Sequence, residues 1–324
     1  MIAGGERTIL YVADIHGSDL CFRKWLNAGR FYGADVLIIG GDLTGKILLP
    51  IYPATNGNGA WTATWRGRQV RLETRAEVDE LVRTARNVGT YGYVTTIDEV
   101  EAIRASPVLE RETFSRLKLE ALEEWVNLAD QRLAGGSVRA LVMAGNDDPP
   151  EIDDVLATAR HLEDVGGSVV EIAPDMHMAS VGESTPTPWH TPRELPDDDL
   201  GARVEAVAQA LPREGTTIWN LHMPPRGTGI DEAPELDDDL RVRYDASGEP
   251  RMRPVGSMSI RQLILEHQPT VALHGHIHEG RGRYRLGRTV GANPGSQDQD
   301  GVLMGVLVRI SATDGVRDLA FTAG

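Results

Sequence analysis

The chain has 324 residues, of which 41% are hydrophobic, so it is long enough to bury a large core. Its 33 basic and 48 acidic residues give a net charge of −15, which disfavours binding to bulk nucleic acid or to an anionic membrane. A single cysteine, Cys21, excludes an intramolecular disulfide, and neither a signal-peptide pattern nor an apolar run of the ~20 residues that span a bilayer is found, which predicts a cytoplasmic protein with no membrane partner.

Short apolar runs alternate with helical patterns along the chain, which predicts an α/β fold. Helices are expected near 74–88, over Glu112–Leu133, where apolar residues recur at steps of three and four, and after Ser257, which can cap a helix. The expected strands are Thr8–Ala13, Val36–Ile39, Val138–Ala144, Thr216–Leu221, Thr270–Leu273, Thr289–Ala292 and Val302–Ile310.

Three long connections interrupt this alternation. Residues 48–110 form an insertion that contains the turn cluster Asn56-Gly57-Asn58-Gly59, residues 182–199 are rich in proline, and residues 227–256 are acidic and loop-like. Long loops inside a compact domain are commonly functional. Because no repeat and no linker divides the chain, we expect a single domain over residues 1–324, with a cap-like insertion at about 48–110.

The first five expected strands each end on Asp, Asn or His. In open α/β sheets, sites form outside the carboxyl ends of the strands, so these five ends can converge on one place. The side chains at these ends are Asp14, His16, Asp42, Asn146, His222, His276 and His278. Carboxylates, an amide oxygen and imidazoles suit manganese, iron, zinc or similar ions, and the lack of cysteine ligands argues against a thiolate site.

The order of these motifs, D-x-H, G-D, G-N-x-D, H and G-H-x-H, resembles that of the calcineurin-like metallophosphoesterase superfamily. The resemblance extends from Asp14 to His278. Finer matches are similar to the Icc-related predicted phosphoesterases, and they lie at Gly41–Lys46, Thr185–Glu194, His222–Thr228 and Asn293–Ser296. The resemblance implies a sandwich of two mixed β-sheets flanked by helices, in αββα layers.

The resemblance also implies a centre of two divalent metal ions. Asp14, His16 and His278 would hold the first ion, and Asn146, His222 and His276 would hold the second. Asp42 would bridge both ions, because a carboxylate has two oxygens. The implied reaction is hydrolysis of a small phosphate-ester substrate by a metal-bound hydroxide. A count of the charges at the centre favours a phosphodiester over a monoester.

Two departures from the superfamily pattern affect the expected chemistry. The second acid of G-D-x-x-D is absent, since Gly45 stands in its place. Asp147 replaces the histidine of G-N-H, which normally protonates the leaving group, so Asp147 and His190 are the candidate general acids. The candidate substrate contacts are Lys46 and Arg226, which can bind phosphate oxygens, and Trp189, which can stack on a ring.

Two other functions remain open on the same fold. A non-hydrolytic interaction or scaffold protein is supported by the missing histidine, but the complete set of seven ligand-type residues opposes this reading. A nuclease is disfavoured by the net charge of −15.

Overall fold

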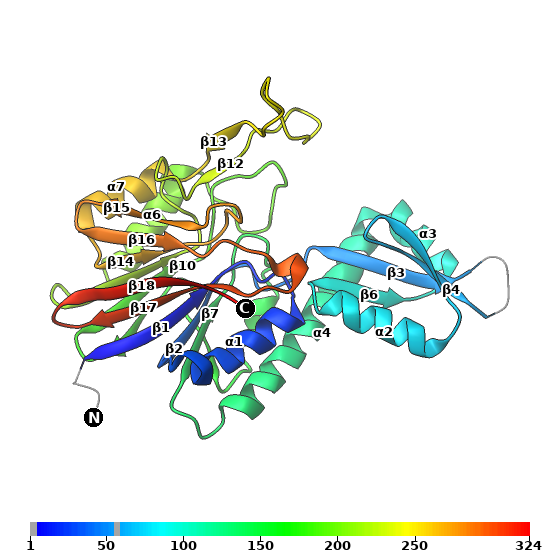
Figure 1. Cartoon of the computed structure of the whole chain (residues 1–324), viewed down its shortest axis with the longest axis horizontal. Helices are drawn as coiled ribbons and strands as arrows, with labels where there is room; N and C mark the ends of the chain where they lie inside the picture. Colours follow the sequence, from blue (N-terminus) through cyan, green and yellow to red (C-terminus); the bar gives the residue numbers. More distant parts are fainter. Residues whose placement is uncertain (1–4, 55–58) are drawn as a thin grey trace.

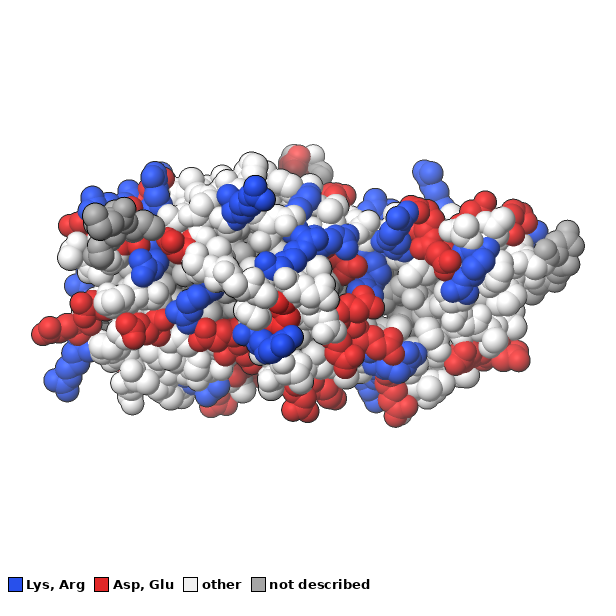
Figure 2. Space-filling view, turned by 90° about the horizontal axis from the view of Figure 1, so that it is seen from below, with Lys and Arg blue, Asp and Glu red and all other residues white. Residues whose placement is uncertain are grey.

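The computed structural model describes residues 5–54 and 59–324, so Asn56, Gly57 and Asn58 of the expected turn cluster lie outside the described residues. A main body made of two packed sheets carries a smaller lobe on one side (Figure 1). Basic and acidic side chains are interspersed on the face shown in Figure 2. No helix in the described ranges is both long and apolar enough to cross a membrane.

The first sheet of the main body is six-stranded and mixed, in the order β18-β17-β1-β2-β7-β8. Its parallel strands are β1 (Glu6–Val12), β2 (Val36–Gly40), β7 (Arg139–Met143) and β8 (Leu162–Asp164). Strand β17 (Met304–Ser311) is antiparallel to β1, and β18 (Gly315–Ala323) is antiparallel to β17. The carboxyl ends of β1, β2 and β7 therefore meet at one edge.

The second sheet is also six-stranded and mixed, in the order β15-β16-β14-β11-β10-β9. Four strands are parallel, namely β10 (Met176–Val181), β11 (Thr216–Leu221), β14 (Val271–Leu273) and β16 (Thr289–Asn293). The outermost strands, β9 (Val169–Ala173) and β15 (Gly282–Leu286), are antiparallel to their neighbours.

The two sheets pack face to face, and helices cover their outer faces (Figure 1). Strand β1 shows the arrangement, because Ile9 and Tyr11 lie in the core between the sheets whereas Leu10 and Val12 pack on the helix side. Helices α1 (Asp19–Tyr32), α4 (Pro107–Leu133) and α5 (Ile152–Leu156) cover the first sheet, and α6 (Asp197–Ala208) and α7 (Met258–His267) cover the second. The expected αββα sandwich is thus confirmed.

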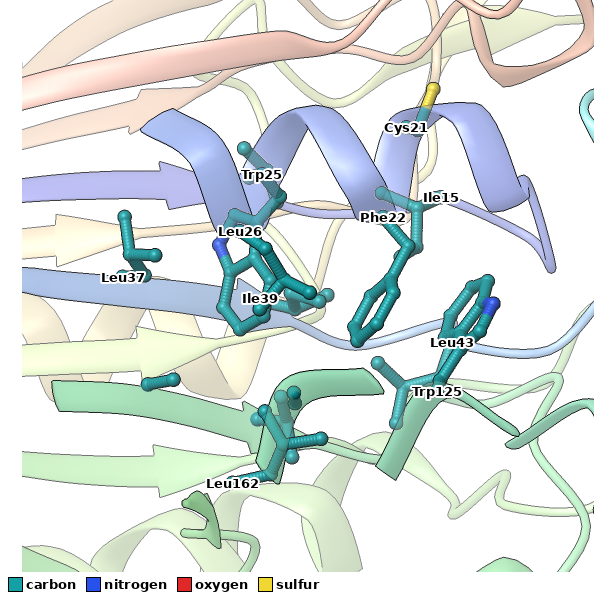
Figure 3. Close-up of a cluster of buried hydrophobic side chains, with 14 of the residues drawn as sticks. Ile15, Cys21, Phe22, Trp25, Leu26, Leu37, Ile39, Leu43, Trp125 and Leu162 are labelled. Carbon is teal, nitrogen blue, oxygen red and sulfur yellow. The ribbon is translucent and has the colours of Figure 1, made fainter. Parts of the chain in front are cut away.

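Aromatic side chains fix the helices on the first sheet. Phe22 of α1 stacks on Trp125 of α4 with ring centroids 4.2 Å apart, and Trp25 lies beside them over strand β2 (Figure 3). Ser18 caps the amino end of helix α1, and its hydroxyl accepts a hydrogen bond from the Cys21 backbone N–H. This packing holds the chain segment between β1 and α1, which carries the first expected ligands.

The insertion forms a lobe with its own sheet and core, at the right of Figure 1. Its sheet has the order β5-β4-β3-β6, made of β3 (Ile47–Pro53), β4 (Trp61–Trp65), β5 (Arg68–Leu72) and β6 (Thr90–Val94). Helix α2 (Arg75–Arg86) confirms the helix expected near 74–88 and begins with a capping box between Thr74 and Glu77. Helix α3 (Ile97–Ala105) leads back to the main body.

Two segments expected to be loops contain regular structure. Helix α6 begins at Asp197, inside the segment 182–199, and three consecutive aspartates in its first turn favour a helix amino end. The segment 227–256 holds strands β12 (Glu232–Pro234) and β13 (Met252–Pro254), which pair as a ribbon that projects from the main body (Figure 1). A short 3₁₀ turn, η1 (Asp298–Asp300), precedes β17.

Candidate metal centre

The structure brings together the seven side chains expected as ligands. They follow β1, β2 and β7 of the first sheet and β11 and β14 of the second, so the two sheets contribute to one cluster. Asp14, His16, Asp42, Asn146 and His222 are buried, whereas His276 and His278 are partly exposed. The site is therefore open beside His276 and His278 and closed toward the two sheets.

One half of the cluster consists of Asp14, His16 and His278. The His16 Nε2 and His278 Nε2 atoms are 2.9 Å apart, and they lie 3.9 and 3.6 Å from Asp14 Oδ1. At most one proton can lie between the two imidazole nitrogens. One donor atom from each residue lies within 4.8 Å of the others, a spacing that a single metal ion can occupy.

The other half is organised around the Asn146 side chain. Its Oδ1 atom lies 2.7 Å from His276 Nδ1 and 3.1 Å from His222 Nε2. His222 Nδ1 lies 2.8 Å from the carbonyl oxygen of Gly40 and donates its proton there. In neutral His222 the Nε2 lone pair therefore faces the Asn146 oxygen, which is also an acceptor, and a bound cation would relieve this conflict.

Asp42 lies between the two halves. Its Oδ2 atom is 3.4 Å from His222 Nε2 and 3.7 Å from His16 Nε2, and its Oδ1 atom accepts a hydrogen bond from the Asp147 backbone N–H at 3.0 Å. Burial opposes the charged form of His222, but Asp42 and Asp14 outweigh it and raise the pKa of His222 to about 9. The carboxylates thus attract a positive charge to this place, either a proton or a metal ion.

Four of the seven residues have strained backbone conformations. The φ angles of Asp14, His16, Asp42 and His276 are 55°, 38°, 56° and 67°, in the left-handed region that non-glycine residues rarely adopt. Each such residue costs roughly 1–3 kcal/mol and persists only when its surroundings hold it. Here the backbone of Asp14 donates to Gly41 and that of His16 donates to Asp42, both at 3.1 Å. The strain is typical of a functional site.

The chemistry of these donors fits a divalent metal centre. Two carboxylates, one amide oxygen and four imidazoles converge, and in the neutral form of His222 its Nε2 atom and the Asn146 oxygen face each other as two acceptors. The His16 Nδ1 atom is buried without a hydrogen-bond partner among the described residues. The buried Asp and His groups are therefore compatible with divalent metal binding.

Asp147 and Lys46 form an ion pair at the rim of the cluster. The Lys46 ammonium contacts Asp147 Oδ2, which lies 4.0 Å from His16 Nδ1. Lys118 donates to the backbone carbonyl of Asp147 at 3.3 Å, so two of the three lysines of the chain meet at Asp147. Burial and the charge of Asp42 raise the pKa of Asp147 to about 6, although Lys46 opposes this change.

The remaining expected site residues have exposed side chains. Trp189 is 65% exposed, and His190 and Arg226 also have exposed side chains. Within the part of the chain that the structure describes, none of these three side chains forms a hydrogen bond or an ion pair with the seven candidate ligands. The structure brings Lys46 and Asp147 to the site, whereas Trp189, His190 and Arg226 stay predictions.

Asp148 organises the site but was missed as a functional residue. Its buried carboxylate accepts hydrogen bonds from Gly145 N–H, Leu43 N–H, and both the N–H and the hydroxyl of Thr44, at 2.7–2.9 Å. It thereby joins the loop that carries Asp42 to the loop that carries Asn146. The second Asp of Asn146-Asp147-Asp148 was the only signal in the sequence, and it does not reveal the partners.

The structure explains why Gly45 replaces the usual second acid. A Cβ atom at this position would lie 2.3 Å from the carbonyl oxygen of Gly89 and 2.9 Å from the Tyr91 ring. Gly89 immediately precedes the lobe strand β6 and Tyr91 lies in it, and the Tyr91 hydroxyl accepts a hydrogen bond from Gly45 N–H at 2.9 Å. The lobe therefore fills the space that the acidic side chain would need.

Comparisons with known proteins agree with this fold. No family model matches the chain. It is 26% identical over 178 residues to the uncharacterized protein MJ1162 of Methanocaldococcus jannaschii, covering 54% of this chain and 70% of that protein. The crystal structure of TT1561 of Thermus thermophilus is similar over 98% of both chains, with 14% identity and a TM-score of 0.52.

Structures described as phosphoester-cleaving enzymes are more distant. The phosphoesterase Yfce of E. coli matches 97% of this chain and 98% of its own, with 12% identity and a TM-score of 0.31. The 5'-nucleotidase precursor of Thermus thermophilus matches 98% of this chain and 54% of its own, with 10% identity and a TM-score of 0.40. Similarity at this level carries no argument about the activity of this chain.

Proposed function

We propose that this protein is a metal-dependent phosphoesterase with two divalent ions, and that phosphodiesters are its favoured substrates. The observation that carries the proposal is the convergence of seven ligand-type side chains from five strand ends, four of them on residues with strained backbone. Two adjacent divalent ions, when bound, activate water and neutralise charge on phosphate oxygens.

The residues of the chain have distinct proposed roles. Asp14, His16 and His278 would hold the first ion, Asn146, His222 and His276 would hold the second, and Asp42 would contribute to both. The hydrogen bond from His222 Nδ1 to the Gly40 carbonyl supports this arrangement, because it directs Nε2 into the site. The carboxylate of Asp42 is also supported in its position by the Asp147 N–H.

The substrate would enter on the side of His276 and His278, where the cluster is partly exposed. The side chain of Lys46 is 44% exposed, and its ammonium lies at the rim, where it can bind a phosphate oxygen. Trp189 and Arg226 remain proposed substrate contacts, and the lobe is a proposed cap over the bound substrate.

Protonation of the leaving group has two candidate donors. Asp147 is supported by its place beside His16 and by its raised pKa, whereas its ion pair with Lys46 favours the carboxylate form that cannot donate. His190 is supported only by its place in the proline-rich loop. The leaving-group dependence of kcat/KM in Asp147→Asn separates these roles, since loss of an acid slows poor leaving groups selectively.

A non-hydrolytic scaffold is the second candidate, and the absence of the usual histidine at Asp147 favours it. Both candidates are tested by stripping the purified protein with a chelator and restoring Mn²⁺, Zn²⁺ or Fe²⁺. The restored protein is then assayed with bis-nitrophenyl phosphate, nitrophenyl phosphate and cyclic nucleotides. We expect two bound ions per chain and metal-dependent cleavage, fastest for a diester. Two bound ions without any turnover would instead support the scaffold, and cleavage of polynucleotides alone would identify a nuclease.

A further inference from the structure

The side-chain amide of Asn146 can adopt two orientations that exchange its oxygen and its nitrogen, and it alone among the seven candidate ligands is an amide. The two ends of its amide have nearly the same shape, but only the oxygen can bind a metal ion, whereas the NH₂ group repels it. In the structure the oxygen faces His222 and His276, and the nitrogen donates to Thr191 Oγ1 at 2.9 Å. What holds the amide this way round decides whether the second ion can bind.

The hydrogen-bond chain beyond Asn146 answers this question. Thr191 Oγ1 lies 2.6 Å from Glu194 Oε1, and the same carboxylate oxygen also accepts the Thr191 backbone N–H at 2.9 Å. Hydrogen bonds from Thr187 and Thr191 lower the pKa of Glu194 although burial opposes this, so the group is an acceptor only. The single hydroxyl proton of Thr191 must therefore point to Glu194, and its oxygen can only accept from Asn146.

We propose that Thr191 and Glu194 are positioning residues, which orient the Asn146 amide so that its oxygen faces the second metal ion. This inference rests on the proposed function. With the amide reversed, the Asn146 oxygen would face the Thr191 oxygen at 2.9 Å, and two acceptors would meet without a proton. An unmade hydrogen bond of this kind costs about 1–3 kcal/mol, which disfavours the reversed amide.

The chain offers a matched control in the same loop. The Thr187 hydroxyl also donates to Glu194 Oε1 at 2.6 Å, and it accepts the Trp189 N–H at 3.2 Å. Thr187→Val and Thr191→Val therefore each remove two hydrogen bonds of a threonine hydroxyl from this loop, but only Thr191→Val releases Asn146. A general weakening of the loop affects both variants alike.

The test is a calorimetric titration of the chelator-stripped full chain with Mn²⁺. For Thr191→Val we expect the second ion to bind about 10–100-fold more weakly, as for other residues that support a metal ligand, whereas Thr187→Val should stay within roughly threefold of wild type. Thr191→Ser keeps the hydroxyl and should restore the affinity. In Glu194→Gln the new NH₂ group can donate to Thr191 Oγ1, so the Thr191 hydroxyl proton becomes free to donate to Asn146. This variant should therefore also bind the second ion more weakly.

Activity gives a second measurement. In Thr191→Val the loss of kcat with bis-nitrophenyl phosphate should shrink as Mn²⁺ is raised, with KM unchanged, because the defect lies in metal binding. Equal weakening in Thr191→Val and Thr187→Val, or wild-type affinity in Thr191→Val, would overturn the inference while the proposed function stands. A wild-type chain that binds fewer than two ions would instead overturn the proposed function.

Discussion

Asp42 is the residue at which the two halves of the candidate centre meet, since its Oδ2 atom lies between His222 and His16. Asp42→Asn should release both ions and lower activity on the order of 10³-fold, because a neutral amide cannot bridge two cations. Asp35→Asn is the matched control, as Asp35 accepts a backbone N–H at the opposite end of the same strand. The metal content of the purified variants, measured by mass spectrometry, checks this. Two ions retained in Asp42→Asn would show that another residue bridges them.

Lys46 differs from the other lysines in its place at the rim of the centre. Lys46→Met should raise KM for a phosphate ester by about 10–100-fold, the effect of losing one hydrogen bond to a charged group, and leave the metal content unchanged. Lys24→Met serves as control, because Lys24 donates to the carbonyls of Gly301 and Gly324. Steady-state kinetics and metal analysis of the two variants distinguish the roles. Metal loss at an unchanged KM would make Lys46 a structural residue.

Cys21 is buried in α1, and burial raises the pKa of its thiol to about 11. Because the thiolate is the reactive form, the native protein at pH 8 should react with a disulfide reagent roughly a hundredfold more slowly than the unfolded chain. The sign follows from the raised pKa, which keeps the thiol protonated up to about pH 11 in the folded state. Absorbance of the released thiolate, with and without guanidinium, measures both rates. Similar rates would mean that α1 opens readily.

At the scale of elements, Asp148 joins the loops after β2 and β7. Four hydrogen-bond donors point at the Asp148 carboxylate, and Asp148→Asn replaces one of its accepting oxygens by an NH₂ group that can only donate. This change should lower the free energy of unfolding by about 2–5 kcal/mol. Asp318→Asn removes an exposed ion pair with Arg309 and should cost at most about 1 kcal/mol. Urea unfolding of the metal-free proteins compares them. A similar small cost for both would show that water satisfies the loop donors.

Most strands buried on both faces could be predicted from the sequence, but β10 (Met176–Val181) was missed although it is buried. The expected bounds of β11, Thr216–Leu221, are those observed, and every residue of this strand except Thr217 is buried. Strands β15 and β18 were missed because charged residues such as Arg283 and Asp318 interrupt their apolar pattern at the exposed edges of the sheets. An edge strand is specified by its neighbour, which the local sequence does not reveal.

The candidate ligands could be predicted because each follows a strand and belongs to a spaced motif. The contacts that orient them could not. The hydrogen bond between Asn146 and Thr191 joins residues 45 positions apart. The close approach of Gly45 to Gly89 depends on where the strands of the lobe join the main body. Such contacts are formed by residue types that are common in loops, so the sequence alone carries no signal for them.

At the scale of the whole molecule, the lobe has a core separate from those of the main body. Ile51→Ala should remove about 2–5 kcal/mol from that core and speed hydrogen exchange in β3, β4, β5 and β6, while exchange in β1, β2 and β7 stays as in wild type. Leu37→Ala in the main core should speed exchange in both parts. Mass spectrometry of peptides after exchange distinguishes them. A uniform increase in Ile51→Ala would show that the molecule opens as one unit.

The close approach of Gly45 to Gly89 also bears on the history of this chain. An aspartate at position 45 and the present start of the lobe cannot occupy the same space, since a Cβ atom there would lie 2.3 Å from a main-chain oxygen. An ancestor with an aspartate at position 45 could therefore acquire a lobe that begins beside this position only if the aspartate were replaced by glycine. The two traits exclude each other, so in a lineage of related sequences the acid and this lobe should replace one another rather than occur together.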